Sequence, residues 1–196
     1  TTSLVADIAP GSASSGLHDF VSFGGNLFFI ANDGVHGPEL WRSNGTSAGT
    51  KMVKDVFAAT NDSEHIQELT VVGETLFFHA REGAGDRRLW KSDGTTAGTI
   101  PVSLEPLGAP GGFLIAPYAP MIEAGGKLYF RAYEPSSGEE IWSSDGTLAG
   151  TRLAYDVTPG PTSTASQFLT EFDDTLLFKS PAGTLWRGGE QGAGAT

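Results

Sequence analysis

The sequence contains no cysteine, has only two methionines and carries few basic residues for its length. The absence of cysteine excludes disulfide bonds, thiolate catalysis and cysteine metal sites. Twelve lysines and arginines stand against 23 aspartates and glutamates, so the net charge is −11. A chain with this charge repels nucleic-acid backbones and anionic membrane surfaces, and we expect neither as a partner.

Long apolar runs are also missing. The sequence has no stretch of about 18 apolar residues that would predict a membrane span, and the segment Thr1-Thr2-Ser3-Leu4 lacks the features of a signal peptide. Glycine, by contrast, is abundant with 27 residues, and 39% of the chain is hydrophobic. This combination is typical of a packed chain with many turns and argues against disorder.

One unit recurs four times, about 50 residues apart. Each copy contains an apolar strand, which begins at Leu27, Leu76, Leu128 or Leu176. A pair formed by an apolar residue and tryptophan follows, with the tryptophans at Trp41, Trp90, Trp142 and Trp186. In the first three copies a Ser-Asn/Asp-Gly-Thr turn and a second Gly-Thr come next, starting at Ser43, Ser92 and Ser144.

Each copy predicts four short strands, which we call a to d. Strand a ends in a tight turn rich in glycine or aspartate, strand b is the Leu-Phe-Phe strand, strand c carries the tryptophan, and strand d follows the Ser-Asp-Gly-Thr turn. Four such strands in about 50 residues match one propeller blade. The predicted fold is therefore all-β, a single four-bladed β-propeller domain with four antiparallel strands per blade. The blades are predicted at residues 17–56, 66–104, 118–157 and 167–196 together with 2–8.

The two ends of the chain complement each other. The fourth copy stops after Trp186 without a strand d, whereas residues 2–8 resemble residues 50–56, which include strand d of the first copy. This pattern predicts a ring closed by the N-terminal strand, which completes the last blade and leaves no exposed inner edge. We expect a monomer, with a strand-exchanged dimer as the alternative.

The motif Glu39-Leu40-Trp41-Arg42-Ser43-Asn44-Gly45-Thr46 resembles the repeat family named after its Glu-Leu-Trp-x-x-Asp-Gly-Thr (ELWxxDGT) consensus, which occurs in secreted bacterial proteins. The match covers nearly the whole chain. It departs at Asn44, at Arg88 and Thr184 in the glutamate position, and in the missing turn of the fourth copy. The resemblance implies a propeller and an extracellular or cell-surface location, and no established activity. The chain is similar to hemopexin-like propellers by architecture only.

The motif residues themselves favour a structural interpretation. The tryptophans are expected to pack between sheets, and the Ser-Asp-Gly-Thr turn to join strands c and d. No cofactor is evident from the sequence. The alternative is that Asp93, Asp145 and their neighbours bind Ca²⁺ or another divalent ion, because such cations prefer clustered oxygen ligands.

Irregular loops mark one face of the predicted ring as the place for a site. The connections from d to a and from b to c differ between copies, and variable loops on a repeat scaffold often carry function. The candidate ligand-binding residues on this face are His18, Asp19, His36, His65, Tyr118 and Tyr133. His18 and His65 could bind a metal or exchange protons, but we favour the interpretation that they are ordinary solvated loop residues.

Two glutamates on the innermost strands are candidates for the channel. Glu123 and Glu171 occupy the same position in their copies and could hold a cation or act as the paired acids of a glycosidase. We favour the alternative that they are merely tolerated near a blade edge.

Three functions remain open from the sequence. The leading hypothesis is a non-catalytic binding module that presents its loop face and channel mouth to a protein or carbohydrate ligand. The alternatives are an enzyme of hydrolase or lyase type with a channel-mouth site, assisted by a metal, and a structural repeat module of a cell-surface protein. The sequence contains no nucleophile elbow, phosphate loop or His-Glu-x-x-His motif.

Overall fold

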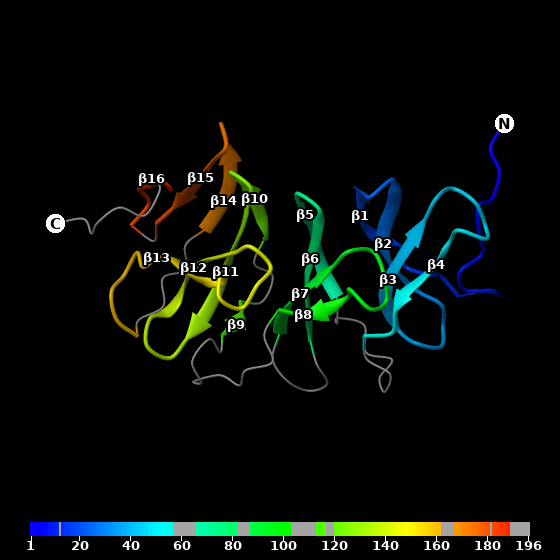
Figure 1. The fold of residues 1–196 in the computed structure, drawn as a ribbon, viewed down its shortest axis with the longest axis horizontal. Helices are drawn as coiled ribbons and strands as arrows, with labels where there is room; N and C mark the ends of the chain where they lie inside the picture. The colour runs from blue at the N-terminus through cyan, green and yellow to red at the C-terminus, as the bar shows by residue number, and fades with distance from the viewer. Residues whose placement is uncertain are drawn as a thin grey trace. The chain divides into compact units, whose positions relative to one another are not determined.

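The computed structural model describes residues 1–11, 13–56, 66–81, 87–102, 113–116, 120–161, 167–180 and 182–188. All regular structure in these residues is antiparallel β-sheet, which confirms the all-β prediction (Figure 1). The chain divides into two compact units, Thr1–Pro101 and Val102–Thr196. Over the same residues, no helix is long and apolar enough to cross a membrane.

Unit 1 contains two four-stranded sheets, each with its strands in chain order. The first sheet consists of β1 (His18–Phe23), β2 (Asn26–Asn32), β3 (Pro38–Ser43) and β4 (Lys51–Lys54). The second consists of β5 (Ile66–Val72), β6 (Thr75–Arg81), β7 (Arg87–Ser92) and β8 (Ile100–Pro101). Each strand pairs with the next through a hairpin, as the predicted order a to d requires.

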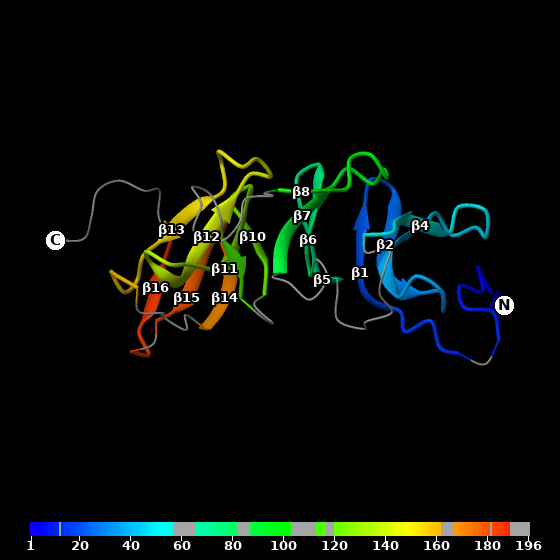
Figure 2. The same cartoon turned by 90° about the horizontal axis from the view of Figure 1, so that it is seen from below.

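Unit 2 contains the other two sheets, which Figure 2 shows at the end of the chain coloured from green to red. The third sheet has β10 (Ile122–Ala124), β11 (Lys127–Glu134), β12 (Gly138–Ser144) and β13 (Arg152–Tyr155), with β9 (Leu114–Ile115) also paired to β11. Within the described residues the fourth sheet has three strands, β14 (Gln167–Phe172), β15 (Thr175–Lys179) and β16 (Leu185–Arg187).

The predicted N-terminal strand is not formed in this structure. Residues 2–8 belong to no strand, and β16 is the last strand of its sheet among the described residues. Instead Val5, Ala6 and Ile8 line an apolar groove together with Phe20 and other residues of the first sheet. An apolar surface is thus available to this segment within unit 1 itself.

The sheets of unit 1 pack through two unlike faces. The first sheet contributes Phe28, Ile30 and Leu40 to the core, and the second contributes residues that include Phe78 and Trp90. Because neighbouring side chains of a strand point to opposite sides, each sheet has one of each kind of face. We call them the leucine face (Phe28, Ile30, Leu40 and their equivalents) and the tryptophan face (Leu76, Phe78, Trp90 and their equivalents).

Unit 2 repeats this packing in the same direction. Ile141 and Ala154 of the third sheet share a core with Leu176 and Phe178 of the fourth, so a leucine face again meets a tryptophan face. Phe178 stacks on Trp186 at a ring distance of 6.2 Å, as Phe78 stacks on Trp90 at 6.0 Å. In both pairs of sheets the earlier copy supplies the leucine face.

The Ser-Asp-Gly-Thr turn is held by its own hydrogen bonds. In the second copy Thr95 donates to Asp93 Oδ1 from both its amide and its hydroxyl, at 2.8 and 2.7 Å. The Thr99 hydroxyl donates to the carbonyl of Thr95 at 2.6 Å, and the Ser92 hydroxyl lies 2.7 Å from Thr99 Oγ1. The first and third copies make the same bonds. The Asp side chains therefore have a structural role here, as the favoured interpretation predicts.

The glutamate of the motif also has a structural role. Glu39 and Glu140 are buried, and their carboxylates accept the backbone N–H groups of Val56 and Val157 at 2.9 and 3.0 Å. These amides follow strands β4 and β13, which have ended at that point. A buried carboxylate that binds such amides stabilises the end of the outer strand.

Candidate functional site

Two of the candidate residues, His65 and Tyr118, lie outside the described residues. His18 and Asp19 are at the start of β1, where His18 Nδ1 is 3.6 Å from Asp19 Oδ2. The same Asp19 oxygen accepts the backbone N–H of Glu68 at 3.0 Å. Asp19 and Glu68 both have positive φ and sit at irregularities of strands β1 and β5, so this contact joins the first strands of the two sheets of unit 1.

His36 belongs to a local turn between β2 and β3. The oxygens of Asp33 accept the amides of Val35 and His36 and contact His36 Nδ1 at 2.7 Å. This side-chain hydrogen bond raises the pKa of His36. Desolvation opposes ionisation of Asp33, but the bonds from His36 and Val35 outweigh it and lower the Asp33 pKa. Both groups therefore favour a charged pair within the turn.

The two candidate channel glutamates occupy equivalent turns of unit 2. Glu123 Oε1 accepts the amide of Gly126, and Glu171 Oε1 accepts the amide of Asp174, both at 2.9 Å. Each carboxylate thus holds the tight turn that follows its own strand. Tyr133 lies near the end of β11, opposite Glu139 on one side and Leu114 on the other. Within the described part of the chain, no three histidine or acidic residues are grouped as metal ligands.

Unit 2 contains a cavity of about 500 Å³ between its two sheets, at the edge where the hairpin turns lie. The third sheet supplies Lys127, Tyr129, Ser143, Arg152 and Tyr155, and the fourth supplies Thr175, Leu176 and Arg187. Ala124, Gly125, Ala154, Asp174 and Gly188 complete the lining. All these residues belong to one unit, and the cavity is the candidate site.

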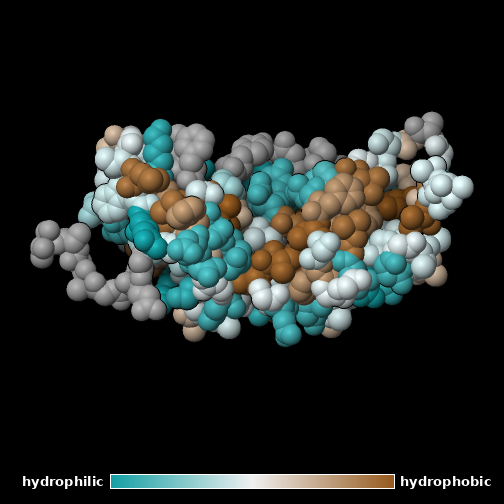
Figure 3. All heavy atoms as spheres, turned by 90° about the horizontal axis from the view of Figure 1, so that it is seen from above, coloured by the Kyte–Doolittle hydropathy of each residue, from teal (hydrophilic) through white to brown (hydrophobic). Residues whose placement is uncertain are grey.

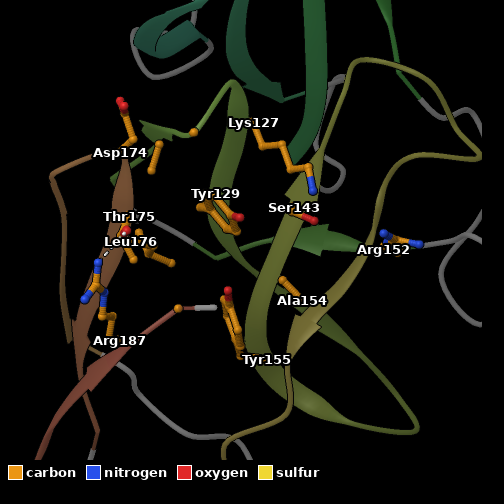
Figure 4. A pocket seen from close by; sticks show the side chains of 13 residues that line it. Lys127, Tyr129, Ser143, Arg152, Ala154, Tyr155, Asp174, Thr175, Leu176 and Arg187 are labelled. Carbon is orange, nitrogen blue, oxygen red and sulfur yellow. Dashed lines mark hydrogen bonds between the residues drawn. The ribbon is translucent and has the colours of Figure 1, made fainter. Parts of the chain in front are cut away.

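Two tyrosine rings lie at the centre of this cavity. Figure 4 shows the Tyr155 hydroxyl pointing toward Tyr129, and the rings stack at 6.3 Å with 20° between their planes. Desolvation raises the pKa of Tyr155 to about 12, and the charge of Tyr129 and a hydrogen bond with Tyr129 act in the same direction. The Tyr155 phenol is therefore protonated at neutral pH, and the tyrosine pair presents uncharged hydroxyl groups to the cavity.

Three cations surround the tyrosine pair. In Figure 4 Lys127 and Arg152 lie on one side of the rings and Arg187 lies on the other. Arg187 Nη2 donates to Thr175 Oγ1 at 3.3 Å. Among the residues that the structure describes, none of the three forms an ion pair. Asp174 is the one carboxylate among the described residues of the lining, and its side chain points away from the tyrosine rings in Figure 4.

The corresponding place in unit 1 is smaller, about 270 Å³, and includes a Ser-Asp-Gly-Thr turn in its lining. Arg42 Nη1 donates to the carbonyl of Gly94 in that turn at 3.1 Å, and Thr96 Oγ1 donates to the carbonyl of Val53 at 2.6 Å. The fourth copy lacks this turn sequence, and the residue described there is Gly188. A Cβ atom on Gly188 would lie 2.5 Å from Tyr155 Oη, so this glycine leaves room for the phenol.

Sequence reasoning placed the site on the irregular loop face and missed this cavity at the turn edge. A usable pattern was present in the alignment of the copies. Tyr129 stands where the first copy has Phe28, and Tyr155 stands where it has Lys54. Only the third copy has tyrosine at both positions, and the fourth copy, which follows it, lacks the Ser-Asp-Gly-Thr turn. This combination would have indicated that the contact between these two copies differs from the others.

Comparisons with known proteins support the fold. No family model matches the chain, and no curated protein matches it. Two solved structures of puromycin hydrolase, one of them a mutant complexed with PGG, match 92% and 93% of this chain at 15% and 14% identity. Their TM-scores are 0.52 and 0.51, and the chain spans 32% of each. Oligopeptidase B from Leishmania major matches 84% of this chain at 15% identity, with a TM-score of 0.48 over 24% of that protein. The puromycin hydrolase structures are of the β-propeller type, so the likeness is to sheets of propeller blades.

Proposed function

We propose that this protein is a non-catalytic binding module and that the cavity of unit 2 takes part of a carbohydrate ligand. The stacked pair Tyr129 and Tyr155 is the observation that carries this proposal. Aromatic rings pack on the apolar faces of sugars, while phenol, serine and threonine hydroxyls bond to sugar hydroxyl groups. Ser143 and Thr175 provide two such hydroxyls beside the rings.

The four sheets, in this proposal, are the blades of one closed four-bladed propeller. Both units stack their sheets with a leucine face against a tryptophan face, which is the repetition a ring needs. Phe20 and Leu27 at the start of the series and Leu185 at its end are exposed apolar residues that a further sheet contact would cover. Figure 3 shows hydrophobic side chains gathered at the surface of unit 1.

The resemblance to ELWxxDGT repeats supports an extracellular or cell-surface location for the module. A protein surface is the alternative ligand of the proposed module. No turnover is expected, because the proposal assigns the cavity only binding.

The experiment is a glycan array, followed by calorimetric titration of the oligosaccharides that bind. We expect Tyr129→Phe and Tyr155→Phe to weaken binding by about tenfold, because each removes a hydroxyl and keeps the ring. Gly188→Ala should also weaken binding, since its Cβ would displace Tyr155. Lys51→Gln in unit 1, at the position equivalent to Arg152, is the matched control and should bind normally. If no oligosaccharide binds, or if these variants bind as the wild type does, the proposal is wrong.

A further inference from the structure

The basic residues around the cavity indicate which class of carbohydrate the protein binds. This inference rests on the proposed binding function. Lys127, Arg152 and Arg187 are three of only 12 basic residues in a chain of net charge −11. They line a single cavity, and Asp174, which is the one carboxylate among its described lining residues, is directed away from the rings. This concentration of positive charge contrasts with the rest of the molecule and favours an anionic ligand.

Two of these three positions are basic in other copies as well, so the difference of unit 2 lies in how its basic groups are bonded. The residues at the same positions in the first copy are Asn26 for Lys127 and Lys51 for Arg152, while Arg187 corresponds to Lys91 in the second copy. In unit 1 the nearby basic side chains Arg42 and Lys54 donate to the carbonyls of Gly94 and Thr99, at 3.1 and 2.8 Å. Protein oxygens thus satisfy the basic groups there. Around the cavity of unit 2 the side chain of Arg187 donates to Thr175 Oγ1 at 3.3 Å, whereas within the described residues no hydrogen bond or ion pair engages the side chains of Lys127 and Arg152.

The tyrosines suit the same ligand. A phenol that stays protonated at neutral pH donates to an anion and does not repel it. Guanidinium groups bind carboxylate and sulfate oxygens with paired hydrogen bonds, and an aromatic ring beside them binds the face of a sugar. The cavity combines both kinds of contact within about 500 Å³, which is the usual size of a small-ligand site.

We propose that the cavity of unit 2 binds an acidic oligosaccharide, with Lys127, Arg152 and Arg187 contacting its carboxylate or sulfate groups and Tyr129 and Tyr155 contacting a sugar ring. The shared chemistry is a sugar chain that carries anions. The source of the negative charge, a uronic acid or a sulfate ester, is distinguished by the probes of the test.

The test is a calorimetric titration of the full chain with three sets of oligosaccharides of equal length: oligogalacturonates, sulfated oligosaccharides and neutral oligogalactosides. We expect at least one acidic set to bind about tenfold or more tightly than the neutral set, with an affinity that falls as salt is raised. Arg152→Gln and Arg187→Gln should each weaken acidic binding about tenfold and leave any neutral binding within about twofold. Lys51→Gln is the control, and the melting temperature of every variant confirms folding.

The outcomes separate this inference from the function on which it rests. Equal binding of acidic and neutral sets, sensitive to Tyr155→Phe but not to Arg152→Gln, would overturn the acidic ligand and leave the carbohydrate module intact. Binding of none of the three sets would overturn both. Acidic binding that Lys51→Gln weakens as much as Arg152→Gln does would show a general charge effect and would also overturn the assignment to this cavity.

Discussion

At the scale of single residues, the second glycine of each Ser-Asp-Gly-Thr unit is explained by one contact. A Cβ atom on Gly98 would lie 2.1 Å from the carboxylate of Asp93, and Gly49 and Gly150 face Asn44 and Asp145 in the same way. Gly98 does not have a positive φ, so its backbone conformation would accept alanine. The glycine is needed because the Asp side chain occupies the place of its side chain.

This contact can be tested with a double-mutant cycle. Gly98→Ala should lower the free energy of unfolding by about 1–3 kcal/mol, because the Asp93 carboxylate must move and lose its bonds to Thr95. In an Asp93→Ala background the same substitution should cost less than about 1 kcal/mol, since nothing then opposes the methyl group. Urea denaturation of the four proteins measures both values. Equal costs in the two backgrounds would contradict the explanation.

His79 predicts how stability depends on pH. It is fully buried on β6, and desolvation, followed by the charge of Arg87, lowers its pKa to about 4. Between pH 6.5 and 4 the unfolded chain therefore binds a proton that the folded chain does not. Stability is complete above about pH 6.5 and is lost as the pH falls toward 4, with a decrease of about 2 kcal/mol between pH 7.5 and pH 5.

The loss of stability between pH 7.5 and pH 5 can be measured by urea denaturation of the wild type and of His79→Ile. The first copy has Ile30 at the same position, so isoleucine should fit and should remove most of the loss. His36→Asn is the control, because the pKa of His36 is shifted in the direction opposite to that of His79. The raised pKa of His36 contributes stability at low pH, so the acid loss should persist in that variant. A loss that is unchanged in His79→Ile would refute the assignment.

At the scale of strands and sheets, the tryptophans are not equivalent. Trp90 is buried in the core of unit 1, whereas Trp186 in the three-stranded last sheet is 44% exposed. Trp90→Ala should cost about 3–5 kcal/mol, and Trp186→Ala about 1–2 kcal/mol. Thermal and urea denaturation compare the two. Similar costs would mean that Trp186 is covered in solution as Trp90 is.

Many of the strands and turns could be predicted from the sequence, because they depend on local patterns of residues. The repeated Leu-Phe-Phe, tryptophan and Gly-Thr segments predict strands b, c and d and the turn, and these lie where β2, β3 and β4 are found. The cavity could not be predicted, because it depends on the distance between two sheets and on which side chains reach into it. Glu123 and Glu171 share a position as the alignment indicates, but only the structure reveals their bonds to Gly126 and Asp174.

At the scale of the whole molecule, ring closure can be tested with engineered cysteines, because the chain has none of its own. In the first sheet Leu40 pairs with Lys54, and the equivalent residues of a completed fourth sheet are Leu185 and Ala6. Cysteines at facing positions of paired strands lie within disulfide reach. Ala6→Cys combined with Leu185→Cys should therefore give an oxidised monomer on a non-reducing gel.

Light scattering of the unmodified protein should give the 20.5 kDa mass of one chain. Ala6→Cys alone is the control and should form no internal bond. A disulfide-linked dimer would indicate strand exchange between two copies. Failure of the pair to oxidise under mild oxidants would contradict closure by the N-terminal segment.

The direction of sheet packing has a consequence for assembly. Both observed sheet contacts join a leucine face to a tryptophan face, so a contact between two copies that repeats this packing joins unlike surfaces and is not symmetric. The contact is head-to-tail, and such contacts end only when they close on themselves. If the four sheets close into the proposed ring, a fragment with fewer sheets would keep one uncovered apolar face at each end, and repeated head-to-tail contacts of such fragments would produce fibres.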